Sequence, residues 1–111
     1  MYYNKEMKVT KTTKNDYLFY QDGVNYILNI GTIKKGDDTT TELLFEDVVN
    51  PQKVSVRAAC GCTTTNKTVI NSDSFSLVLK YTRCETSIDN TVIINEGKSD
   101  SIKIKVKGKC Q

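Results

Sequence analysis

The strongest constraint on the fold is a strict alternation of apolar and basic residues near the C-terminus. The apolar members are Ile102, Ile104 and Val106, and the basic members are Lys103, Lys105, Lys107 and Lys109. Because successive side chains of a β-strand point to opposite faces, this pattern predicts a strand with its apolar face in the core and its lysines in solvent.

The lysine row has two interpretations. In one, the lysines form a solvated face close to a sheet edge, where charge prevents association with other strands. In the other, they dock on an acidic partner or on phosphates. Exposed runs of charge are commonly just solvated, which favours the first interpretation.

The rest of the chain also has the sequence pattern of β-strands. Short runs of β-branched and aromatic residues are separated by residues that favour turns. The expected strands are Tyr26–Ile33, Thr41–Val49, Lys53–Ala59, Lys67–Ile70, Phe75–Tyr81, Ile88–Ile94 and Ser101–Lys109. A further strand is expected over Lys8–Thr12 or Tyr17–Tyr20. No segment carries a helical apolar stripe over ten or more residues. About seven short strands predict an all-β sandwich of two sheets, formed by residues 23–111.

Residues 1–22 differ in character from the rest and form either an N-terminal arm or an extra strand of the sandwich. Four bulky side chains follow one another there: Tyr17, Leu18, Phe19 and Tyr20. A strand cannot turn all four to one side, so some are exposed unless they pack against another chain. We therefore predict that they contact a protein partner, with the lysine row as a second contact.

The composition excludes several classes of function. The 111 residues contain no histidine, so there is no Ser-His-Asp or Cys-His pair, no histidine-ligated metal, and no enzyme is expected. The net charge of +3 is too small to indicate nucleic-acid binding by itself. No apolar run approaches the roughly 20 residues of a membrane span. The N-terminal residues do not resemble a secretory leader, which indicates a chain that stays where it is made or has lost its leader.

The four cysteines, Cys60, Cys62, Cys84 and Cys110, leave three interpretations open. Reduced thiols that pack as small apolar groups come first, since a reducing compartment is the default without a leader. A single disulfide between the Cys60-Gly61-Cys62 loop and Cys84 or Cys110 comes second. A zinc site comes third, because the C-x-C spacing is shorter than that of most structural sites. No cofactor or small-molecule substrate is expected.

Several segments resemble a bacterial immunoglobulin-like domain of unknown function. Three of them are the strand and turn Tyr26–Gly36, the strand end Leu43–Asn50 and the closing strand Ile102–Gly108. The most specific is Val54–Thr64, in which Cys60-Gly61-Cys62-Thr63 follows a strand. The family is similar to the abnormal-spindle, major-sperm-protein and hydin modules. The resemblance implies an immunoglobulin-like fold and a binding or structural role, without implying any chemistry.

This sequence departs from the family in its Asn71–Ser74 turn, in Cys84 and Cys110, and in N-terminal residues that do not resemble the leader expected of most members. The expected function is a structural or binding module, in its most specific form a small decoration protein on a bacteriophage capsid. Such a protein is made in the host cytoplasm and is present in many copies on the virion surface. The alternatives are a periplasmic or cell-surface adhesion module, or a thiol or metal-binding domain centred on the Cys-Gly-Cys loop.

Overall fold

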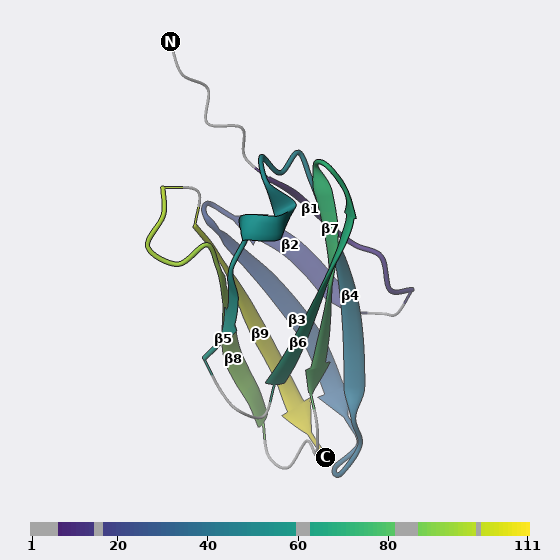
Figure 1. Ribbon diagram of the computed structural model, residues 1–111. Helices are drawn as coiled ribbons and strands as arrows, with labels where there is room; N and C mark the ends of the chain where they lie inside the picture. Colours follow the sequence, from purple (N-terminus) through teal and green to yellow (C-terminus); the bar gives the residue numbers. More distant parts are fainter. Residues whose placement is uncertain (1–6, 15–16, 60–62, 82–86, 100) are drawn as a thin grey trace.

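The computed structural model describes residues 7–14, 17–59, 63–81, 87–99 and 101–111 (Figure 1). In these residues the chain forms nine β-strands and one short 3-10 helix. The strands are β1 Lys8–Lys11, β2 Leu18–Asp22, β3 Asn25–Ile33, β4 Thr39–Glu46, β5 Val56–Ala58, β6 Thr63–Asn71, β7 Ser74–Tyr81, β8 Ser87–Ile94 and β9 Ile102–Cys110. The 3-10 helix η1 covers Pro51–Lys53, between β4 and β5.

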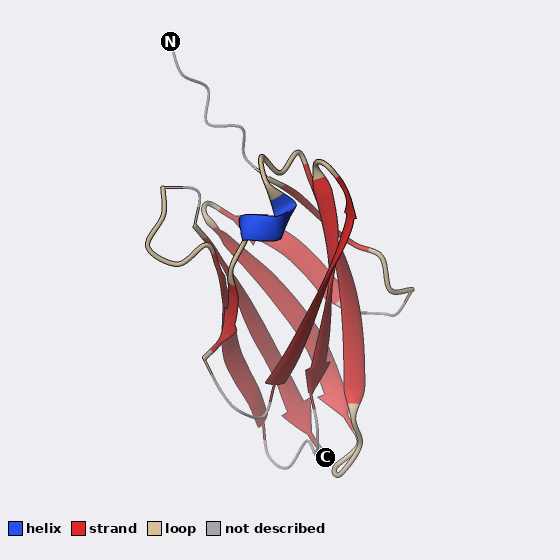
Figure 2. Ribbon diagram, viewed as in Figure 1, coloured by secondary structure: helices blue, strands red, loops and turns tan. Residues whose placement is uncertain are grey.

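Two sheets pack face to face, which confirms the predicted all-β sandwich (Figure 2). One sheet has four strands in the order β1-β4-β7-β6, and the other has five in the order β2-β3-β9-β8-β5. The neighbouring strands are antiparallel except β3 and β9, which are parallel. The first 22 residues supply one edge strand to each sheet, β1 to the smaller and β2 to the larger.

Local chemistry explains where the strands differ from the expected ranges. β4 ends at Glu46 rather than Val49, because Asp47 has a φ of 57° and turns the chain. Pro51 then begins η1, so the strand expected from Lys53 is confined to Val56–Ala58. β6 begins earlier than expected, at Thr63, since its run of β-branched threonines suits a pleated strand.

The core fills the space between the two sheets. Its fully buried side chains come from the inward faces of both: Leu28, Leu43, Phe45, Phe75, Leu77, Leu79, Val92, Ile94, Ile104 and Val106. Phe45 and Phe75 are cross-strand partners with ring centroids 4.5 Å apart and nearly parallel planes. Each such side chain contributes about 1.5–3 kcal/mol on burial, so this layer holds the two sheets together.

The alternation that defined the last strand is confirmed, but its expected place in the sheet is wrong. Ile104 and Val106 are fully buried, while Lys103, Lys107 and Lys109 are exposed and Lys105 is half-buried. However, β9 lies between β3 and β8, in the middle of the five-stranded sheet rather than close to its edge. Alternation reports which side of a strand faces the core, and it carries no information about the strand's neighbours.

A β-bulge shapes the middle of the five-stranded sheet. The pairing of β3 with β9 shifts between Asn29 and Gly31, where Gly31 adopts a φ of 67°. Ile30 continues the inward alternation of Tyr26 and Leu28 and lies over Gly108, where an added Cβ would overlap its Cγ1 atom. Gly108 is therefore required by close packing in an otherwise regular strand.

Candidate functional site

The strand β2 divides the four bulky residues of the N-terminal segment between two sides. Tyr17, just before the strand, and Phe19 pack against the core. Phe19 stacks on Tyr26 with centroids 5.5 Å apart, and the Tyr17 hydroxyl is hydrogen-bonded to the hydroxyl of Thr39. Leu18 and Tyr20 point outward and remain 63% and 54% exposed. Of the four predicted contact residues, only these two are available to a partner.

Strand register brings Leu18 and Tyr20 onto the same face as the lysine row. Leu18 pairs with Asn29, which pairs with Lys107, and Tyr20 pairs with Ile27, which pairs with Lys105. Directly paired residues in neighbouring strands share a face of the sheet. The two contact sets, which lie at opposite ends of the sequence, therefore meet on the outer face of the five-stranded sheet.

We call this surface the lysine face. It consists of Leu18, Tyr20 and Asp22 of β2, Asn25, Ile27 and Asn29 of β3, Lys103, Lys105, Lys107 and Lys109 of β9, Asp89, Thr91 and Ile93 of β8, and Arg57 of β5. Lysines occupy its central strand, and an apolar group of Leu18, Tyr20 and Ile27 lies on the β2 side.

Positive charge on the lysine face is unevenly compensated. Asp89 lies directly opposite Lys107, whereas Lys105 is flanked by Thr91 and Ile27. Lys109 is likewise flanked by uncharged residues. Within the described part of the chain, no carboxylate lies within 4.0 Å of any of the four β9 lysines. Lys103 is flanked by Asn25 and Ile93, so the uncompensated charge lies around Lys103, Lys105 and Lys109.

Two shallow hollows mark the bulge on this face, and both are lined by Asn29, Gly31 and Thr32. One, of about 430 Å³, continues to Lys107, Lys109, Ser87 and Asp89. The other, of about 680 Å³, continues to Leu18 and Lys14. The hollows thus join the lysine row to the exposed β2 residues.

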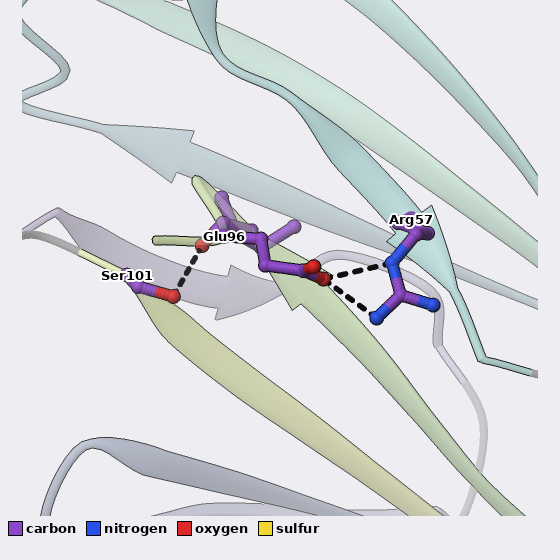
Figure 3. Close-up of polar contacts among 4 residues, drawn as sticks. Arg57, Glu96 and Ser101 are labelled. Carbon is purple, nitrogen blue, oxygen red and sulfur yellow. Dashed lines mark hydrogen bonds and ion pairs between the residues drawn. The ribbon is translucent and has the colours of Figure 1, made fainter. Parts of the chain in front are cut away.

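Arg57, at the β5 border of the lysine face, is held by an ion pair. Its Nε and Nη2 atoms lie 2.7 and 2.6 Å from Oε2 of Glu96, in the loop that follows β8 (Figure 3). In the same loop the Ser101 hydroxyl donates to the Ile94 carbonyl at 3.0 Å. Because Glu96 already compensates Arg57, the available positive charge of the face comes from β9.

Lys67 is an important residue that the sequence interpretation did not single out for any contact with the core. It lies on β6 in register with the inward-facing Thr63 and Thr65. Its ammonium donates to the carbonyls of Pro51 and Val54, both at 2.8 Å, and lies 5.8 Å from the centroid of the Phe75 ring. The sequence signal was present, because the alternation of β6 places Lys67 on the core side.

Cys110 is buried and disulfide-bonded, and the sulfur to which it is joined lies outside the described residues. The expectation of reduced thiols is therefore wrong for Cys110. A disulfide depends on two Cβ atoms being close in space, which a sequence does not reveal. The zinc interpretation loses Cys110 as a thiolate ligand, and its other candidates, Cys60, Cys62 and Cys84, lie outside the described residues. In the described ranges no three His, Cys, Asp or Glu side chains cluster as metal ligands.

Comparison with known proteins gives no relative from which a function could be transferred. The sequence matches no protein-family model and no curated protein. The resemblance to an immunoglobulin-like family therefore stays a prediction. The described segments contain no helix with the length and apolar character needed to cross a bilayer.

Proposed function

We propose that this chain is a non-enzymatic structural and binding module that attaches to a protein assembly through the lysine face. The observation that carries the proposal is the meeting of Leu18 and Tyr20 with the β9 lysines on one sheet face. Aromatic side chains are enriched at protein interfaces, where a few anchors supply most of the affinity and a polar rim surrounds them.

The most specific form of this proposal is an auxiliary protein that decorates a bacteriophage capsid in many copies. A capsid offers the same site many times, so one contact face on each chain is enough to place the chain on the particle in many copies. The disulfide at Cys110 is compatible with this placement, because disulfides persist on virion surfaces.

The test is to purify particles of the virus whose genome encodes this chain and to measure its copy number by mass spectrometry. The wild-type chain should be present in many copies. The double variant Leu18→Ser/Tyr20→Ser should occupy at least about tenfold fewer sites, since each side chain contributes on the scale of an interface anchor. Absence of the wild-type chain from purified particles would rule out the virion role.

Ile70→Ser is the matched control for this measurement. Ile70 is 54% exposed, as is Tyr20, but it belongs to β6 in the other sheet. We expect full occupancy for Ile70→Ser. Deletion of residues 1–20 is not a useful substitute, because it removes β1 and most of β2 together with the core contacts of Tyr17 and Phe19.

The disulfide favours a second candidate, a periplasmic or cell-surface adhesion module. Disulfides form and persist in these oxidising compartments and are rare in the cytosol. Fractionation of the source cells, followed by thiol alkylation with and without reductant, separates the candidates. An oxidised chain recovered from the cell envelope of uninfected cells would support the adhesion module over the capsid protein.

A further inference from the structure

The position of β9 leaves its lysines without the protective role that an edge would give them. Charged side chains often keep exposed sheet edges from pairing with other strands. Here the edges of the five-stranded sheet are β2 and β5, and β9 is paired on both sides. The lysine row therefore does not protect a sheet edge from pairing. Four lysines on one face of a central strand need another explanation.

The spacing of the row matches that of an extended chain. Alternate residues of a strand lie about 6.7 Å apart, so the four lysines span about 20 Å. A second extended polypeptide repeats its side chains at the same interval. Carboxylates at every second residue of such a segment would each meet one lysine along β9.

Charge determines which kind of partner fits. A second copy of this chain, placed face to face, would bring lysine rows into mutual repulsion. An acidic segment would instead compensate four basic groups that have no carboxylate within 4.0 Å among the described residues. Leu18, Tyr20 and Ile27 lie to one side of the row, so apolar side chains next to the acidic segment would also find contacts.

We propose that the lysine face binds an extended acidic segment of a partner protein, with Asp or Glu at alternate residues paired to Lys103, Lys105, Lys107 and Lys109. The inference rests on the proposed function and names the chemistry of the partner's contact. It also predicts an order among the lysines. Lys107 already faces Asp89, so its contribution is the smallest, and Lys103, Lys105 and Lys109, whose paired neighbours are uncharged, contribute more.

The experiment uses two synthetic peptides of identical composition and the full chain. In the first peptide an Asp-Thr pair is repeated four times, and in the second four Asp residues precede four Thr residues. Fluorescence anisotropy at low salt should show the alternating peptide binding at least about fivefold more tightly, since it makes several exposed ion pairs that the clustered peptide cannot make together.

Single substitutions test the order of the lysines. Lys103→Gln, Lys105→Gln and Lys109→Gln should each weaken binding of the alternating peptide by about three- to fivefold, the scale of an exposed ion pair, and Lys107→Gln should weaken it by less. Lys8→Gln and Lys80→Gln, on the outer face of the four-stranded sheet, are the matched controls and should leave affinity unchanged. Raising the salt concentration should weaken binding of the alternating peptide.

Several results would overturn the inference. Equal affinity for the two peptides would show attraction to polyanions without register, and tighter binding of a single-stranded oligonucleotide would point to nucleic acid instead. If the control and β9 substitutions change the affinity for the peptide equally, the lysine face is not the binding site. Particle attachment that survives all four β9 substitutions would overturn this inference while leaving the proposed function on Leu18 and Tyr20. Peptide binding by a chain that is absent from purified particles would support this inference and rule out the virion role.

Discussion

One lysine of the four-stranded sheet turns inward, whereas the lysines of the central strand in the five-stranded sheet turn outward. In the four-stranded sheet, Lys67 belongs to the edge strand β6 and turns inward, where three backbone carbonyls, chiefly those of Pro51 and Val54, accept its hydrogen bonds. In the five-stranded sheet, the lysines of the central strand β9 turn outward and have no carboxylate within 4.0 Å in the described part of the chain.

The outer faces of the two sheets also differ in how far their positive charge is balanced by carboxylates. On the four-stranded sheet Lys8 lies opposite Glu46, and Lys80 is 3.9 Å from Asp38. Charge there is balanced along a surface rich in threonine. Among the residues that make up the lysine face, only Asp22 and Asp89 carry negative charge beside the four β9 lysines. The comparison teaches that one residue type stabilises the fold in one sheet and leaves charge available for binding in the other.

The largest effect, on attachment to particles, is expected when all four β9 lysines of the lysine face are neutralised. Substitution of Lys103, Lys105, Lys107 and Lys109 by Gln should reduce particle attachment by about 100-fold or more, if each lysine contributes on the scale of an exposed ion pair. The melting temperature should change little, because surface substitutions typically alter stability by less than about 0.5 kcal/mol each. Quantitative mass spectrometry of particles and circular dichroism melting measure the two effects. A comparable loss of stability would mean that the lysines support the fold.

Lys67, which turns inward, should instead contribute to the stability of the fold. Lys67→Ala should lower the free energy of unfolding by about 1.5–3 kcal/mol, because hydrogen bonds from a charged donor to partly buried carbonyls are lost. Urea denaturation measures this change, with Lys105→Ala as the matched control. Equal stability of the two variants would contradict the contrast between the sheets.

Lys67→Met separates the two contributions of this side chain. Methionine keeps a long apolar stem beside Phe75 but donates no hydrogen bond. If the carbonyls of Pro51 and Val54 depend on the ammonium, Lys67→Met should recover only part of the stability lost in Lys67→Ala.

The close-packed centre of the five-stranded sheet is the next target. Gly108→Ala should cost about 1–3 kcal/mol, because the added methyl group overlaps Ile30 in a packed core. Thermal melting followed by circular dichroism measures the loss. Lys107→Ala, one residue earlier and on the outer side, is the control and should melt like the wild type. A Gly108→Ala chain of unchanged stability would mean that the bulge relaxes to accept the methyl group.

The smallest effect is expected at the Arg57–Glu96 pair. Both side chains are more than half exposed, so Glu96→Gln should cost less than about 1 kcal/mol. The loss should diminish further at high salt, where exposed charges are screened. Urea denaturation at low and high salt provides the measurement. A loss as large as that of Lys67→Ala would show that the loop after β8 depends on this contact.

Much of the fold was predictable because strand alternation is local. The inward positions of Ile104 and Val106, and the outward positions of the β9 lysines, follow from period two alone. The end of β4 was less predictable, because a left-handed turn at Asp47 overrides the β propensity of Val48 and Val49. A disulfide at Cys110 was only the second interpretation of the cysteines, since the sequence does not show which distant residues approach one another.

For this protein, the sequence by itself determined the all-β class, the positions of most strands, and which side of β9 faces the core, since each follows from side-chain chemistry within a few residues. Only the tertiary structure decided that β9 is a central strand and that β2 joins the same sheet. The physical reason is that hydrogen bonds between strands link residues far apart in the chain, and their register decides which outward side chains become neighbours. The lysine face, with Leu18 and Tyr20 on the same side as Lys105 and Lys107, is a product of that register.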